Sequence, residues 1–153
     1  MKKIIYLLPL LLLCLSCSND SSDDLPGNET EGSIFTVEYS QTGDSDQFSQ
    51  EITFYSAYGW KDTDTENDVD ANLNSENSAL PGSLSYTTKQ ASPGIWVTYN
   101  VAPDNVEEGI SLDVTFKFYK DGELIDTKNL SIGDESTATD SFQWEYFSDT
   151  SDE

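Results

Sequence analysis

The stretch ISLDVTFKFYKDGELIDT, residues 110–127, decides the fold. From Ile110 to Phe118 every second residue is large and apolar, and the residues between them are polar. This period of two is typical of a strand with one face in the core and one face in water. Asp121-Gly122 follows, and this pair favours a two-residue type I′ turn, in which both positions need a positive φ. The stretch therefore predicts an antiparallel β-hairpin.

The register of this hairpin follows from counting outward from the turn. Lys120 then lies opposite Glu123, and Lys117 lies opposite Asp126, so that opposite charges face each other across the strands. The same count places Phe118 opposite Ile125 on the side of the core.

Five further stretches alternate in the same way, and no stretch has the 3.6-residue apolar period of a helix. They are SIFTVEY (33–39), FSQEITFYS (48–56), SLSYTT (83–88), GIWVTYNV (94–101) and SFQWEYF (141–147). Pro81-Gly82 and Pro93-Gly94 are turn signals between them. Many short strands separated by such turns predict an all-β fold, an antiparallel immunoglobulin-like β-sandwich over residues 33–147.

The first residues are typical of a secretory signal. Two lysines precede an apolar run over residues 4–13, which is shorter than the roughly 20 residues of a spanning helix. Small Ser16 then directly precedes Cys17. This order of residues resembles the lipobox of bacterial lipoproteins. The resemblance implies that residues 1–16 are removed, that the Cys17 thiol receives a diacylglycerol, and that the new amine is acylated with a fatty acid such as palmitate.

Residues 17–32 have the polar composition of a flexible linker, and residues 148–153 form an acidic tail predicted to be disordered. Asp20, Asp23 and Asp24 follow the cysteine closely. They resemble the surface-export signal of lipoproteins from one gram-negative group, although a solvated tether would have the same composition. The resemblance predicts an outer-membrane protein that is lipid-anchored and exposed at the cell surface.

The charge of the chain limits its partners. The formal net charge is −22, and loss of residues 1–16 leaves five lysines against 29 acids, a net charge of −24. Nucleic acid is excluded, because its phosphates are bound by lysine and arginine. Anionic headgroups would repel this surface too, so membrane attachment must come from the N-terminal lipid. A protein or a glycan remains as a partner.

An acidic stretch is the candidate metal site. Its carboxylates occupy alternate positions: Asp62, Asp64, Glu66, Asp68 and Asp70. Calcium prefers six to eight oxygen ligands, so three of these acids in one loop could bind Ca²⁺. The stretch is not an EF-hand, because Asn67 and Leu73 occupy the positions of the required Gly and Glu. The alternative is a solvated acidic loop.

Trp60 and Trp96 are the candidate ligand-contacting aromatics, since indole rings beside amides and carboxylates can hold sugars. Core packing is the alternative for each of them. Catalysis is not expected, because the chain has no histidine to serve as a base or a zinc ligand.

The stretches FTVEYS, GIWVTYNV and LDVTFKFYKDGELIDT resemble the strands of small immunoglobulin-like lipoproteins of bacterial envelopes. We therefore expect a lipid-anchored, non-enzymatic binding or structural module with a protein partner. The alternative is a calcium-dependent adhesive or glycan-binding surface domain.

Overall fold

The computed structural model describes residues 32–76, 79–104, 109–133 and 140–147, and these form nine strands and one short 3-10 helix, η1 (Ser45–Gln47). The strands are β1 (Phe35–Gly43), β2 (Phe48–Ser56), β3 (Trp60–Asp62), β4 (Asn72–Asn74), β5 (Ser83–Thr88), β6 (Gly94–Pro103), β7 (Ser111–Lys120), β8 (Glu123–Gly133) and β9 (Asp140–Phe147). Cys17, Ser16, Asp20, Asp23, Asp24 and the tail 148–153 lie outside the described residues.

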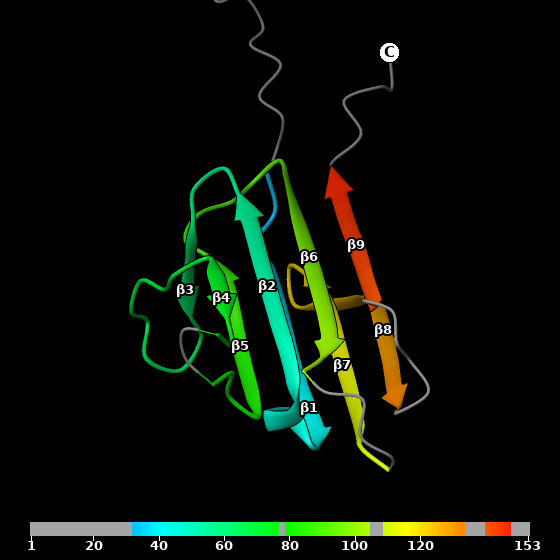
Figure 1. Cartoon of the computed structure of the whole chain (residues 1–153). Helices are drawn as coiled ribbons and strands as arrows, with labels where there is room; N and C mark the ends of the chain where they lie inside the picture. The colour runs from blue at the N-terminus through cyan, green and yellow to red at the C-terminus, as the bar shows by residue number, and fades with distance from the viewer. Residues whose placement is uncertain (1–31, 77–78, 105–108, 134–139, 148–153) are drawn as a thin grey trace, which may run out of the picture.

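The strands form two antiparallel sheets, in the orders β3-β5-β1-β7-β8 and β4-β2-β6-β9. Figure 1 shows the four-stranded sheet in front of the other. The prediction of an all-β antiparallel sandwich is confirmed. Without the two short strands β3 and β4, the sheets contain four and three strands, as in a constant-type immunoglobulin domain. The order of these strands within the sheets is different from the immunoglobulin order.

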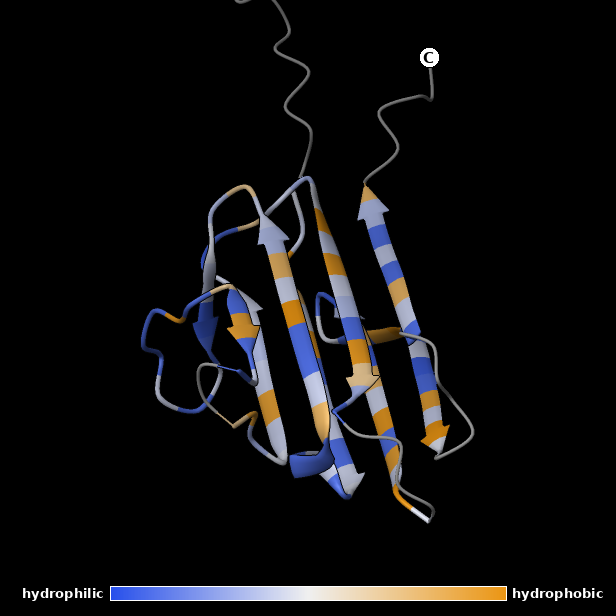
Figure 2. Ribbon diagram, viewed as in Figure 1, coloured by the Kyte–Doolittle hydropathy of each residue, from blue (hydrophilic) through white to orange (hydrophobic). Residues whose placement is uncertain are grey.

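The predicted alternation determines which side chains form the core. In Figure 2 apolar and polar residues alternate along the long strands of both sheets. The inward residues of β1, β2, β6 and β7 are buried: Phe35, Val37, Tyr39, Phe48, Ile52, Phe54, Ile95, Val97, Tyr99, Val101, Leu112, Val114, Phe116 and Phe118. Burial of such side chains stabilises the fold by about 1.5–3 kcal/mol each.

Phe116 is at the centre of the aromatic part of this core. Its ring centroid lies 5.1 Å from that of Tyr39, 5.3 Å from that of Tyr99 and 4.9 Å from that of Phe142. These three rings come from β1, β6 and β9, so Phe116 on β7 joins the two sheets. Tilted and edge-on arrangements of this kind are favourable for aromatic rings.

The hairpin between β7 and β8 has the predicted turn, with φ of 50° at Asp121 and 85° at Gly122. Lys120 pairs with Glu123, as predicted. Beyond Tyr119 the register shifts by one residue, and Ile125 is the extra residue of a β-bulge.

Because of this bulge, two of the predicted pairs are wrong. Phe118 lies opposite Asp126 and not Ile125, and Lys117 lies opposite Thr127 and not Asp126. The physical reason is a contact from the other sheet, because Asp126 accepts a 2.8 Å hydrogen bond from the indole nitrogen of Trp144. The pKa of Asp126 lies below its usual range, mainly because the ammonium group of Lys128 is 2.8 Å from the carboxylate. The hydrogen bond from the Trp144 indole lowers this pKa further.

The first and last described residues lie at the same end of the sandwich (Figure 1). Ser33 forms a bridge with Ser92, and two residues further on Gly94 pairs with Phe147. The N-terminal segment therefore joins the domain at this end, which we call the tether end. Among the described residues no helix is long and apolar enough to span a membrane.

Candidate functional site

The outer face of the four-stranded sheet is the candidate site, and we call it the binding face. Strand register places its outward side chains in three rows across β4, β2, β6 and β9. From the tether end, the rows are Tyr55, Trp96, Glu145; Asn72, Thr53, Thr98, Gln143; and Asn74, Glu51, Asn100, Ser141. One row is mainly aromatic, and the other two consist almost entirely of amides and hydroxyls.

Two exposed aromatic rings form the first row. The rings of Tyr55 and Trp96 lie 5.9 Å apart at an angle of 45°, and their side chains are 57% and 39% exposed. Phe147, 58% exposed, lies opposite Gly94, two residues before Trp96 on the same face. These three residues form an aromatic strip across β2, β6 and β9. Large exposed aromatic side chains gathered in one place are typical of an interaction site.

Gly94 allows Phe147 to lie over β6. A Cβ atom at this position would overlap Phe147 Cδ1 and would lie 2.5 Å from the backbone oxygen of Tyr146. We expect Gly94→Ala to lower the free energy of unfolding by about 1–3 kcal/mol, because the strands must move apart. Urea denaturation measures the change. Gly133→Ala on β8 is the control, since its Cβ would meet nothing within 4 Å. Equal losses in the two variants would contradict this packing.

A shallow hollow of about 180 Å³ lies at the other end of the binding face. Glu51, Asn74 and Asn100 line it together with Ser49 and Ala102. The amide of Asn100 and the carboxylate of Glu51 make no hydrogen bond within the described part of the chain, so both are free to bind a ligand. Their lack of internal partners distinguishes them from Asn74, whose side-chain oxygen accepts a hydrogen bond from the backbone of Glu76.

The binding face carries no positive charge. Lysine is absent from β2, β4, β6 and β9, and the whole sequence has no arginine. The face has three carboxylates, those of Glu51 and Glu145 in its rows and that of Glu76 at the hollow. It therefore disfavours anionic ligands and offers neutral ligands hydrogen-bonding groups beside aromatic rings.

Trp60, the other predicted ligand residue, is only 1% exposed and packs in the core against Phe54, with ring centroids 5.7 Å apart. The prediction that Trp60 contacts a ligand is therefore wrong. The reason is the pairing of β3 with β5, which turns this side chain inward. Its indole nitrogen has no hydrogen-bond partner in the described residues.

The predicted acidic loop is held by its own contacts. Asp62 Oδ1 accepts hydrogen bonds from the Thr65 backbone and hydroxyl and from the Asp64 backbone, and the Thr65 bonds hold the Asp62 pKa below its usual value. Glu66 pairs with Lys61, and Asp68 pairs with Lys89.

The side-chain oxygen of Asp70, the last acid of this loop, accepts a 3.0 Å hydrogen bond from the backbone N–H of Asn72. Of the residues that the structure describes, no three acids are close enough together to hold a metal ion. The five carboxylates therefore do not converge in this arrangement.

A second group of acids lines a cavity of about 310 Å³ beside η1. Asp46, Glu76 and Asp104 face it from three different segments. Asp104 accepts a 2.6 Å hydrogen bond from Ser49, whereas the other two carboxylates make no hydrogen bond or ion pair with described residues. The folded chain places these three acids around one cavity, although they too are not close enough together to hold a metal ion in this arrangement. Because they come from distant segments, the sequence pattern could not reveal them.

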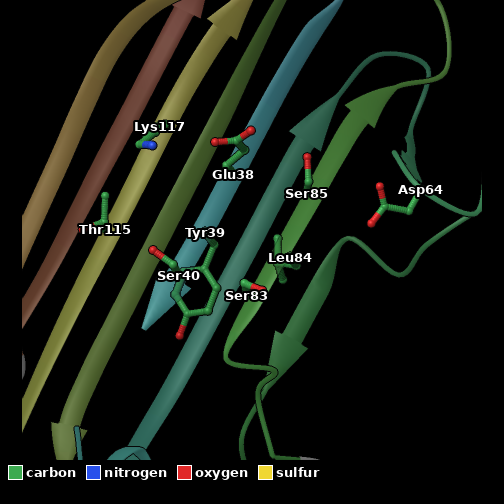
Figure 3. A pocket seen from close by; sticks show the side chains of 9 residues that line it. All are labelled: Glu38, Tyr39, Ser40, Asp64, Ser83, Leu84, Ser85, Thr115 and Lys117. Atoms are coloured by element: carbon green, nitrogen blue, oxygen red, sulfur yellow. The ribbon is translucent and has the colours of Figure 1, made fainter. Parts of the chain in front are cut away.

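The outer face of the five-stranded sheet has a depression of about 350 Å³ (Figure 3). It is lined by small hydroxyl side chains and by three charged ones: Ser40, Ser83, Ser85, Thr115, Glu38, Lys117 and Asp64. The ammonium group of Lys117 forms no ion pair within the described part of the chain. Tyr39 is the only aromatic residue among those that line it, and its ring is buried in the core.

Comparison with solved structures places this fold among known domains. A crystal structure of a domain of unknown function, DUF4425, from Bacteroides vulgatus has a TM-score of 0.64 at 16% identity, covering 76% of this chain and 97% of that one. A DUF4425 family protein from Bacteroides ovatus has a TM-score of 0.65 at 15% identity, with 74% and 95% covered.

An NMR structure of the calcium-bound form of a protein from Parabacteroides distasonis has a TM-score of 0.65 at 22% identity, with 82% and 98% covered. At these identities the similarity shows the fold alone. No family model matches the chain, and no curated protein matches it.

Proposed function

We propose that this chain is a lipid-anchored lipoprotein of the bacterial outer membrane, and that its domain is a non-enzymatic binding module. Its partner binds at the binding face. The observation that carries this proposal is the exposed pair of Tyr55 and Trp96 on a sheet face without lysine. A merely structural outer face would not need to leave two large aromatic rings in water.

The order of residues at the N-terminus supports the anchor. Ser16 and Cys17 resemble a lipobox, and Asp20, Asp23 and Asp24 resemble a surface-export signal. Protease treatment of intact cells tests the leaflet, and the outward leaflet requires cleavage of the domain.

Cys17→Ser tests the anchor. We expect the wild-type protein to sediment with membranes and to carry diacylglycerol on its first residue, Cys17, in intact mass spectrometry. The variant should lose nearly all membrane association, because its serine receives no thioether-linked lipid and a highly acidic domain has no other means of attachment. Cys14→Ser is the control and should be processed normally. A variant that still sediments with membranes would contradict the proposal.

Calcium binding is a second candidate function. It is favoured by the calcium-bound form of the similar protein from Parabacteroides distasonis. In this chain the acids at the cavity beside η1 are better suited than the acidic loop, since Asp46 and Glu76 have no internal partners. Calcium needs six to eight oxygen ligands, so Asp46, Glu76 and Asp104 would have to move together around it.

We expect millimolar calcium to raise the melting temperature and EDTA to reverse the rise. A hundredfold excess over Kd adds about 2.7 kcal/mol to the free energy of unfolding. The double variant Asp46→Asn/Glu76→Gln should lose this response, and Asp64→Asn/Asp68→Asn should retain it. If calcium does not change the melting curve of the wild type, calcium binding is excluded as a function. If Asp64→Asn/Asp68→Asn loses the response and Asp46→Asn/Glu76→Gln retains it, the calcium site is in the acidic loop.

A further inference from the structure

We infer that the binding face holds a neutral, linear oligosaccharide that lies along β6 from the aromatic strip to the hollow. This inference rests on the proposed function, because it names the ligand of the same face. It depends on four features of the described residues: an aromatic platform, free hydrogen-bonding groups, the spacing of the rows and the charge.

The platform is at the tether end of the face. The Trp96 and Tyr55 rings are exposed and inclined at 45° to each other, so they form an angled surface and not a flat one. The C–H-bearing face of a pyranose ring packs on such aromatic rings, and the amphipathic indole tolerates the hydroxyls at the sugar's edge. Glu145 lies beside Trp96 on β9, where its carboxylate can accept hydrogen bonds from those hydroxyls.

The polar rows continue from this platform. Thr53 and Thr98 lie side by side on β2 and β6, and their hydroxyls make no hydrogen bond with described residues. Asn100 and Glu51 follow at the hollow, also without side-chain partners. A sugar has hydroxyls around its whole ring that both donate and accept, and this mixture of hydroxyl, amide and carboxylate groups matches it.

The distance fits a short chain of sugars. Trp96 and Asn100 are four residues apart on one strand, which is about 13 Å, the length of about three pyranose units. A shorter ligand could reach the platform or the hollow but not both. We therefore expect affinity to rise with chain length up to about three sugars and then to level off.

The charge of the face favours a neutral glycan over an anionic one, and the position of its apolar residues favours a glycan over a protein. The face has three carboxylates, those of Glu51, Glu76 and Glu145, and its strands have no lysine, within a chain of net charge −22. Sulfated sugars and uronic acids would be repelled. A stable protein interface has an apolar centre with charged residues at its rim, whereas here the aromatic strip is at one end and the centre is formed by threonines.

The experiment uses isothermal titration of the mature domain with neutral linear hexaoses: cellohexaose, laminarihexaose, mannohexaose, xylohexaose and chitohexaose. We expect at least one to bind, the dimer of the same sugar to bind more weakly than the trimer, and Trp96→Ala to lower the affinity by about tenfold or more. Lys117→Ala, on the opposite sheet, is the control and should bind normally. The inference is overturned if none binds at millimolar concentration, or if both variants bind like the wild type.

A photo-crosslinking residue at Thr98 in living cells separates this inference from the proposed function. Cross-linking to polysaccharide supports both. A discrete protein adduct at Thr98, with no sugar bound in titration, would overturn the glycan and leave the binding face intact. Neither kind of adduct, together with no titration signal, would overturn both. A further experiment measures binding of the domain to vesicles of phosphatidylethanolamine. If the wild type is retained on these vesicles and Trp96→Ala is not, the aromatic strip binds lipid and the inference of a glycan ligand is overturned.

Discussion

Gln50→Leu should destabilise the domain by about 2–5 kcal/mol, because it leaves two buried hydroxyls without a partner. The Gln50 side-chain oxygen accepts hydrogen bonds from Tyr39, at 3.0 Å, and from Tyr99, at 2.8 Å. All three residues are at most 3% exposed. Leucine nearly keeps the volume, so the loss in urea denaturation measures lost hydrogen bonds and not a cavity. These are the two tyrosine bonds and the weaker bond, at 3.4 Å, that Gln50 Nε2 donates to the backbone oxygen of Ser45.

The triple variant Tyr39→Phe/Gln50→Leu/Tyr99→Phe is the control. It removes both donors together with the acceptor, and such replacements are close to neutral when shape is kept. We therefore expect it to be more stable than Gln50→Leu alone. If the triple variant is as unstable as the single one, then the hydrogen bonds are not the cause.

The same tyrosines make stability sensitive to alkaline pH. Burial raises the pKa of Tyr39, and burial together with the neighbouring Tyr39 raises that of Tyr99. Above about pH 10 the unfolded chain releases these two protons and the native domain keeps them, so the free energy of unfolding falls as pH rises. The expected slope is about 1.4 kcal/mol per pH unit for each tyrosine, and Tyr39→Phe/Tyr99→Phe should lose it.

Phe116→Ala should lower the free energy of unfolding by about 3–5 kcal/mol, a large part of the stability of a domain of this size. The side chain is fully buried and its ring contacts three other rings from β1, β6 and β9. Its removal opens a cavity where the two sheets meet, and differential scanning calorimetry measures the fall. Tyr55→Ala, at an exposed aromatic ring, should cost less than about 1 kcal/mol. Similar losses in both would contradict the assignment of core and binding face.

Local sequence patterns were sufficient to predict most of the fold. Alternation in residues 48–56, 94–101 and 110–120 predicts three long strands, and it puts Tyr55 and Trp96 on the faces opposite those of Phe54 and Ile95. A period of two determines the face of a side chain without any knowledge of the partner strand. The Asp121-Gly122 turn was equally local, since it depends only on the φ preference of these two residues.

The features that sequence patterns missed depend on distant contacts. The bulge at Ile125 places Asp126 against Trp144, eighteen residues away. Strands β3 and β4 have three residues each, which is too short for a period to be read, so the inward turn of Trp60 could not be predicted. The aromatic strip requires β6 to lie between β2 and β9, and the alternation of each strand alone does not specify this order.

The binding face is tested most directly by NMR titration of the isotope-labelled mature domain with the hexaose that binds best in calorimetry. We predict that the largest shifts occur at the Trp96 indole N–H and at the backbone amides of Tyr55, Thr98 and Asn100, with the amides around Lys117 unchanged. Shifts confined to the depression beside Lys117, or spread evenly over both sheets, would contradict it.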